Sequence, residues 1–279
     1  FFLYYPTHMV HGPLIPDEEY QGKSGVGIYG DFVLQLDDYV GQIIDKLKEK
    51  GVFEDTIVIF SSDNGASGVA DIPGLIQQGH NPSYHFRGTK FDIWEGGHRE
   101  PTIVSYPRVI KAGSVSDQLV CHTDFYRTLA ELIGVQLADN EAEDSVSNLA
   151  LWQGNNVSVR EDVIHSSANG AFSIRRGSWK LIFVEDNGAD VEAMLAKPSE
   201  GKFKPYQLYY LQDDIEEKNN VIEKYPEIVE KLQAILEDYI RNGRSTPGVP
   251  QPNGRNNPDG DWPQISFMKD FEEVISKTV

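Results

Sequence analysis

Two adjacent residues with oxygen-bearing side chains, Asp63 and Asn64, directly follow the apolar run Thr56–Phe60. That run has the composition of a buried strand, and ligands of open α/β sheets bind at the carboxyl ends of strands. Carboxylate and amide oxygens are hard ligands that suit Ca²⁺ or Mg²⁺ better than zinc. Asp-Asn-Gly is also a common turn sequence, so these residues alone leave a metal site and an ordinary turn both open.

A histidine and a lysine occupy comparable positions elsewhere in the chain. His11 lies in the loop after the apolar run Phe1–Tyr5, where an imidazole can donate to an oxyanion or act as a general acid. A loop histidine bonded to backbone is the alternative interpretation. Lys90 lies beside Gly88 in a loop, where its ammonium group can contact an anion. Weaker candidates for a substrate pocket are His8, His98 and His165.

Other residues of these types are expected to have structural roles. Arg87 and Arg99 are expected to pair with carboxylates of the core, and Cys121 is expected to be a small core residue. The chain has no Ser-His-Asp order, Walker loop or Gly-x-Gly-x-x-Gly motif. The sequence therefore gives no support to a hydrolase triad or a nucleotide site.

The periodicity of apolar residues predicts the elements that position these side chains. Helical spacing runs from Val33 to Leu47, with lysines in the last turns. Strands are predicted at Thr56–Phe60 and Thr102–Tyr106, and a second helix at Thr123–Ile133. Phe1–Tyr5 is predicted to be a buried strand in the middle of a domain. The alternation of strand and helix predicts an α/β fold with a mainly parallel sheet between helices.

The pattern changes after about residue 160, where a small α+β subdomain is predicted. It should contain a hairpin turning at Gly177, a further strand and an amphipathic helix, over residues 171–176, 178–184, 207–211 and 225–241. The acidic stretch Asp139–Asp144 is expected to be a solvated connector, and the tail after Arg244 is expected to wrap the surface as coil. The predicted domains are 1–158 for the α/β part, 159–243 for the subdomain and 244–279 for the tail.

Composition excludes several classes of partner and site. The chain of 279 residues has 25 basic and 43 acidic side chains and a net charge of −18, which argues against nucleic acid or an anionic membrane surface as a partner. Its single cysteine excludes an internal disulfide framework and a cysteine-based zinc site. No apolar run approaches the ~20 residues of a membrane-spanning helix.

Several longer stretches, in this order along the chain, resemble the sulfatase family, the formylglycine-dependent arylsulfatases of the alkaline phosphatase superfamily. They are FFLYYPTHMVHGPL, TIVIFSSDNG, GHNPSYHFRGTKFDIWEGGHREP, HTDFYRTLAELIG, FSIRRGSWKLI, QLYYL and NGRSTPG. The resemblance implies an alkaline-phosphatase-like fold and hydrolysis of aryl or carbohydrate sulfate esters. It implies that Asp63 and Asn64 bind a divalent cation, Ca²⁺ rather than Mg²⁺. It further implies that His11 protonates the leaving oxygen and that Lys90 binds sulfate oxygens.

One part of the family's pattern is missing. The family's nucleophile is a formylglycine made from the Cys or Ser of a C/S-x-P-x-R motif, and no such motif occurs here. We therefore expect the chain to be the C-terminal portion of a longer protein. The missing N-terminal segment would supply the formylglycine and further cation ligands, and the chain alone is predicted to be inactive. By resemblance the protein is periplasmic or secreted, although no signal is visible in the chain.

Two other functions remain open at this point. One is a phosphodiesterase or phosphonate hydrolase of the same superfamily, which would carry a plain Thr or Ser nucleophile. The other is a non-catalytic fragment that binds sulfated glycans, which would bind calcium without turnover. We take sulfuric ester hydrolase as the leading interpretation because Asp63, Asn64, His11 and Lys90 are all present.

Overall fold

The structure is a computed structural model that describes residues 1–190, 203–253, 262–270 and 273–274. It divides into two compact units. Unit 1 comprises Phe1–Lys90 and Gly96–Arg108, and unit 2 comprises Phe91–Glu95 and Val109–Val279. Among the described residues, no helix is both long enough and apolar enough to cross a membrane.

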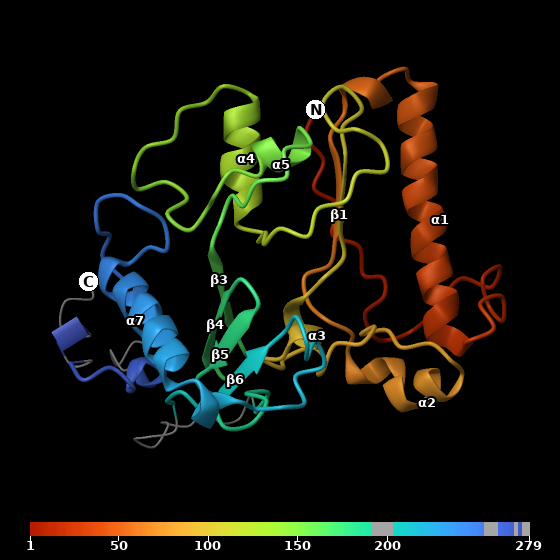
Figure 1. The fold of residues 1–279 in the computed structure, drawn as a ribbon. Helices are drawn as coiled ribbons and strands as arrows, with labels where there is room; N and C mark the ends of the chain where they lie inside the picture. Colours follow the sequence, from red (N-terminus) through yellow and green to blue (C-terminus); the bar gives the residue numbers. More distant parts are fainter. Residues whose placement is uncertain (191–202, 254–261, 271–272, 275–279) are drawn as a thin grey trace. The chain divides into compact units, whose positions relative to one another are not determined.

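Unit 1 contains the long helix α1 and a two-stranded sheet (Figure 1). The helix α1 spans Gly27–Glu49, which confirms the helix predicted from Val33 to Leu47. Asp31 of α1 is buried, and its carboxylate accepts hydrogen bonds from the backbone N–H groups of Gly22 and Ser24 at 2.7 and 2.8 Å. This carboxylate therefore fixes the loop before the helix to its first turn.

The sheet of unit 1 differs from the predicted parallel arrangement. Strand β1 (Val58–Ser61) pairs with β2 (Thr102–Ser105) in antiparallel register, with Ser61 opposite Thr102. The strand predicted at Phe1–Tyr5 is wrong, because this segment forms no strand and its aromatic side chains are exposed. A strand requires a partner for its ladder of hydrogen bonds, and apolar composition alone does not provide one. All strand pairings in the described residues are antiparallel.

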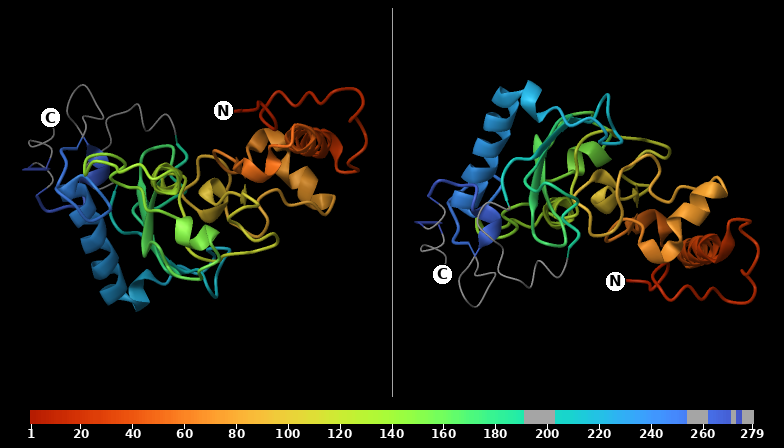
Figure 2. Two further views of the ribbon diagram at one scale, coloured as in Figure 1. Left: turned by 90° about the horizontal axis from the view of Figure 1, so that it is seen from above. Right: turned by 90° about the horizontal axis from the view of Figure 1, so that it is seen from below.

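Unit 2 is built on a four-stranded antiparallel sheet in the order β3-β4-β5-β6. Its strands are Asp162–Ser166, Phe172–Arg176, Trp179–Ile182 and Gln207–Tyr210. Helix α7 (Pro226–Asn242) lies along one face of this sheet (Figure 2). The hairpin at Gly177, the strand near 207–211 and the helix near 225–241 were all predicted and are confirmed. Strand β3, which was not predicted, completes the sheet.

The two faces of the four-stranded sheet pack against different parts of the chain. Leu181 of β5 and its neighbours on that face pack against Leu232 and Leu236 of α7. Ile182, on the opposite face, belongs to a second apolar cluster with Ile93 of the segment Phe91–Glu95. The sheet therefore packs against α7 on one face and against the segment Phe91–Glu95 on the other.

The shorter helices have the following bounds. In unit 1, α2 is Ile72–Gln77, and the single turn α3 is Glu95–His98, which begins at the last residue of the unit 2 segment. In unit 2, α4 is Asp124–Leu132, which confirms the predicted helix at Thr123–Ile133, and α5 is Leu149–Trp152. Single 3-10 turns lie at 53–55, 68–70, 222–224 and 263–265.

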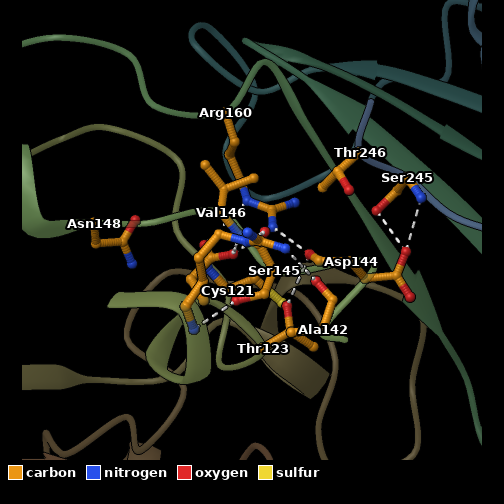
Figure 3. A network of polar contacts seen from close by, with 12 residues as sticks. Cys121, Thr123, Ala142, Asp144, Ser145, Val146, Asn148, Arg160, Ser245 and Thr246 are labelled. Atoms are coloured by element: carbon orange, nitrogen blue, oxygen red, sulfur yellow. Dashed lines mark hydrogen bonds and ion pairs between the residues drawn. The ribbon is translucent and has the colours of Figure 1, made fainter. Parts of the chain in front are cut away.

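The acidic stretch Asp139–Asp144 is largely exposed, as predicted for a solvated connector, but two of its carboxylates also bind the C-terminal tail. Asp144 accepts hydrogen bonds from the backbone N–H and the hydroxyl of Ser245 at 2.8 and 2.7 Å (Figure 3). Asp139 pairs with Arg244 at 2.9 Å. These two carboxylates therefore anchor the start of the C-terminal tail, because both meet donors from about a hundred residues later. Residues 254–261 of the tail lie outside the described residues.

A buried ion pair lies beside this anchor. The carboxylate of Asp124, at the start of α4, pairs with Arg160 and also accepts the backbone N–H groups of Cys121 and Val146 at 2.8 and 2.9 Å (Figure 3). Arg160 in turn donates to the carbonyl of Asp144 at 2.9 Å. One carboxylate thus fixes the beginning of a helix and two loops at once. Cys121 itself is half-buried.

Candidate functional site

In unit 1, two loops and the helical turn α3 contact the segment that follows β1, which carries Asp63 and Asn64. The N–H of Lys90 donates to the carbonyl of Ala66 at 2.9 Å, and the N–H of Gly65 donates to the carbonyl of Gly97 at 3.1 Å. Gly12 also lies against this segment, since a Cβ placed on it would lie 3.3 Å from Cγ2 of the Val69 side chain. The backbones that carry the proposed site residues are therefore gathered around one loop.

Two glycines make this close approach possible. A Cβ on Gly65 would lie 1.8 Å from the carbonyl oxygen of Gly96, and a Cβ on Gly96 would lie 2.3 Å from that of Gly88. Real side chains do not reach such distances, so the three backbones can be stacked only because these positions lack a Cβ. The N–H of Gly96 also donates to the carbonyl of Arg87 at 2.7 Å. The glycine-rich sequence around residues 88–97 thus has a packing function.

Asp63 is exposed and Asn64 is half-buried at the start of this loop. The amide nitrogen of Asn64 donates to the carbonyl of Gly65 at 3.2 Å, so the amide oxygen is the atom available to a cation. These two hard oxygen donors fit Ca²⁺ or Mg²⁺. No group of three or more His, Cys, Asp or Glu side chains suited to a metal occurs in the part of the chain that the structure describes. A cation bound here therefore requires further oxygen ligands.

Glu100 is a residue of this site that the sequence analysis missed. Burial and then the charge of Asp63 raise the pKa of Glu100 to about 7, and its Oε1 is buried without a hydrogen-bond partner. The register explains the proximity: Ser61 lies opposite Thr102 at the end of the ladder, and Asp63 and Glu100 each follow two residues beyond this pair. An antiparallel pairing of the two predicted strands would have identified it. Because the charge of Asp63 is one cause of the raised pKa, a cation beside Asp63 would favour the ionised form of Glu100.

His11 and Lys90 lie in the loops that meet here. The Nδ1 of His11 lies 2.7 Å from the carbonyl oxygen of Gly12. Because a carbonyl only accepts, Nδ1 carries the hydrogen of this bond, and Nε2 is the atom that can exchange a proton with a ligand. His11 is exposed and Lys90 is half-buried. Their side chains thus have access to a ligand, and their catalytic roles are a proposal developed below.

The weaker candidates have different surroundings. The exposed His8 places its ring against Phe32 of α1, with ring centroids 5.5 Å apart, which favours a packing role. His98 is half-buried at the end of α3, two residues before Glu100. Arg99, for which a carboxylate partner was expected, holds its guanidinium 4.6 Å from the centre of the Phe86 ring.

His165 belongs to unit 2 and lies on β3. Its Nδ1 is 3.4 Å from the hydroxyl of Ser173 on the neighbouring strand. Burial, and then the positive charge of Lys180, lower the pKa of His165 to about 3, while Glu95 acts in the opposite direction. The ring is therefore neutral throughout the physiological pH range, and His165 cannot serve as a proton donor there.

The low pKa of His165 predicts acid sensitivity. Its folded-state pKa of about 3 lies below the ordinary value of 6.5. Between these values the unfolded chain binds a proton that the folded protein does not, so this contribution to stability is lost as the pH falls through that window. From His165 alone we expect a loss of about 3 kcal/mol in the free energy of unfolding at pH 4 relative to pH 7. Urea unfolding at both pH values measures it.

The matched comparison is between two histidine variants. His165→Gln should reduce the difference between pH 7 and pH 4, whereas His122→Gln, at an exposed position in the same unit, should leave it as in the wild type. Comparing variants is necessary because burial raises the pKa of Glu217, which acts on stability in the opposite direction. An unchanged pH dependence in His165→Gln would contradict the assignment.

The chain is similar to proteins of known family. The family described as Sulfatase matches residues 1–135, which include Asp63, Asn64, His11 and Lys90. The chain is 35% identical over 240 residues to an N-acetylgalactosamine-6-O-sulfatase of Bacteroides thetaiotaomicron, covering 85% of this chain and 46% of the relative. It is 32% identical to arylsulfatase A of Bos taurus, covering 84% of this chain and 47% of the relative.

Solved structures show the same relationship. One solved structure is described in connection with the metabolism of multiple glycosaminoglycans by Bacteroides thetaiotaomicron. It superimposes on this chain with a TM-score of 0.71 at 33% identity, covering 83% of this chain and 48% of that one. A sulfatase from Pseudoalteromonas sp. gives a TM-score of 0.66 at 26% identity, covering 83% and 46%. The chain thus spans about half the length of the relatives that it matches. With its mixed helices and sheets the chain has the α/β, alkaline-phosphatase-like fold, and its residues 1–135 belong to the sulfatase family.

Proposed function

We propose that the protein hydrolyses sulfate esters of carbohydrates or aryl alcohols, and that this chain contributes one part of the active site. The observation that carries the proposal is that the loops of His11 and Lys90 both contact the segment that follows Asp63, through Val69 and Ala66. The names of the relatives, an N-acetylgalactosamine-6-O-sulfatase and an arylsulfatase A, support the same class of substrate.

In this proposal Asp63 and Asn64 hold a calcium ion through a carboxylate and an amide oxygen. When bound, the ion supplies positive charge that stabilises the anionic oxygens of the sulfate group. The ammonium group of Lys90 binds sulfate oxygens from its own loop, which is fixed to the Asp63 loop by the hydrogen bond to Ala66. The site is locally positive when occupied, although the whole chain has a net charge of −18.

His11 is proposed to give a proton to the leaving oxygen. Its Nδ1–H donates to the carbonyl of Gly12, which orients the ring and leaves Nε2–H to face the ester oxygen. Negative charge develops on that oxygen as the S–O bond breaks, and the proton neutralises it. The proposed nucleophile is a formylglycine. Because the 279 residues contain no C/S-x-P-x-R motif, we propose that it comes from sequence outside them. We also propose an exported protein, periplasmic or secreted, on the basis of family membership.

The role of His11 predicts a dependence on the leaving group. In the intact protein, His11→Ala should lower kcat/KM for a 6-sulfated N-acetylgalactosamine by about 10²–10⁴, because a sugar alkoxide needs a proton. With an activated aryl sulfate the loss should be below about tenfold, since a stabilised phenolate leaves without protonation. Initial rates of sulfate release with both esters measure the difference.

His8→Ala is the matched control for this experiment. His8 lies three residues before His11, and its ring packs against Phe32, so its replacement should produce no dependence on the leaving group. Equal losses on both esters in His11→Ala would remove the general-acid role. An absence of sulfate release by the wild-type intact protein with either ester would overturn the proposed function itself.

A further inference from the structure

A network of buried charges in unit 2 surrounds Lys180, outside the proposed active site. The side chain of Lys180, on β5, is 0% exposed and lies 3.0 Å from a carboxylate oxygen of Glu95 and 3.0 Å from one of Glu217. Both carboxylates are also buried. Arg175 of β4 approaches the second oxygen of Glu95 at 2.9 Å. Two cations and two carboxylates thus neutralise one another inside the protein.

The sheet register makes Glu95 necessary to this network. Arg175 and Lys180 are directly opposed on neighbouring strands, and like charges in such a pair repel each other. The carboxylate of Glu95 lies against both cations, one oxygen to each. In addition, the backbone N–H of Glu95 donates to the carboxylate of Glu217 at 2.7 Å. Both the side chain and the backbone of Glu95 are therefore fixed.

Glu95 also has a specific position along the chain. It ends the segment Phe91–Glu95, whose preceding residue is Lys90 and whose following residue is Gly96. Both flanking residues make backbone hydrogen bonds within unit 1: the N–H of Lys90 donates to the carbonyl of Ala66, and the N–H of Gly96 donates to the carbonyl of Arg87. Ile93, in the middle of the segment, is fully buried in the apolar cluster on the same side of the sheet. The short segment is thus held by charge at its end and by apolar packing at its centre.

We propose that Glu95, held by Lys180, is a positioning residue for Lys90. A buried ion network contributes little net stability compared with apolar residues of similar volume, but its directional bonds fix one backbone geometry. Glu95 is the last residue of the five-residue segment that follows Lys90, and it is bonded to Gly96. Fixing the backbone of Glu95 therefore restrains the position of Gly96 and, through the segment, that of Lys90. Breaking the network should therefore loosen the loop of Lys90 in addition to destabilising unit 2. The effect on catalysis rests on the proposed function, whereas the effect on the loop does not.

The test compares Lys180→Met with Arg160→Met in the intact protein. Arg160 is the control because it also belongs to a buried ion pair of unit 2. Its partner in that pair is Asp124, which lies outside the segment Phe91–Glu95. Both variants should lower the melting temperature. Hydrogen exchange measured by mass spectrometry on peptides covering residues 86–97 should become about tenfold faster in Lys180→Met only. Glu95→Gln, which keeps the side-chain volume, is the second variant if Lys180→Met does not fold.

Kinetics supply the second readout. At a temperature where both variants are folded, Lys180→Met should lose about tenfold in kcat/KM for sulfate esters, and Arg160→Met should retain the wild-type value. Equal exchange in residues 86–97 of the two variants would overturn the positioning role. So would faster exchange in Lys180→Met with unchanged kcat/KM. If the wild-type protein releases no sulfate, the proposed function fails, and the exchange experiment still decides whether Lys180 fixes the loop.

Discussion

Asp63→Ala is expected to lower sulfate ester hydrolysis by roughly 10³-fold or more in the intact protein. The substitution removes the only carboxylate among the two cation ligands proposed in this chain and leaves the neutral amide of Asn64. A site binds a divalent cation less tightly when it loses a carboxylate ligand, because a neutral amide oxygen supplies no negative charge. The expected result is therefore a combined loss of bound calcium and of activity. Metal content of the purified protein and kcat/KM with and without added calcium measure the two losses.

Asp45→Ala is the control for this substitution. Asp45 is an exposed carboxylate of α1 in the same unit, so the change in net charge is the same while the proposed site is untouched. It should retain both calcium and activity. Wild-type calcium content in Asp63→Ala would show that Asp63 is not a ligand, even if activity fell.

Asp124→Ala should have the largest effect on stability, a loss of about 3–5 kcal/mol in the free energy of unfolding. The substitution leaves the buried guanidinium of Arg160 without its carboxylate and leaves the N–H groups of Cys121 and Val146 without their acceptor. The cost is high because the side chains of Asp124 and Arg160 are only 0% and 7% exposed, so water cannot replace the lost partner. Urea unfolding at pH 7, followed by circular dichroism, gives the free energy.

A surface ion pair of the same unit provides the comparison. Glu216 pairs with Lys218, and both side chains are well exposed, so Glu216→Ala should cost less than about 1 kcal/mol. If the two substitutions destabilised the protein equally, the buried network of Asp124 would have no special role in the fold.

Local periodicity was sufficient to predict the elements that bury one face. Helices α1, α4 and α7 and the hairpin at Gly177 were all predicted, because apolar spacing and turn chemistry are properties of neighbouring residues. The partner of β1 was not predictable in the same way. Pairing depends on residues some forty positions away, and an apolar run such as Phe1–Tyr5 has the same composition whether or not a partner is present.

The same distinction applies to the site. His11, Asp63, Asn64 and Lys90 were identified from residue type, position after predicted strands and resemblance to a family. Glu100 was missed because its proximity to Asp63 follows from the antiparallel register. The contacts of Asp139 and Asp144 with the tail were not predicted because their partners follow about a hundred residues later. Buried charges are especially hard to predict, since a charged residue has the same local sequence signal on a surface and in a core.

The anchoring of the acidic stretch has a consequence for biosynthesis. Asp144 and its partner Ser245 are separated by 101 positions, and a ribosome adds roughly 5–20 residues each second. The carboxylates of this stretch therefore leave the ribosome several seconds, on the order of 5–20, before the donors that they bind have been made. Asp124 and Arg160, which are 36 positions apart, can pair much earlier. During translation the helix that begins at Asp124 can thus be stabilised first, and the contacts between the acidic stretch and the tail form only after Ser245 has emerged.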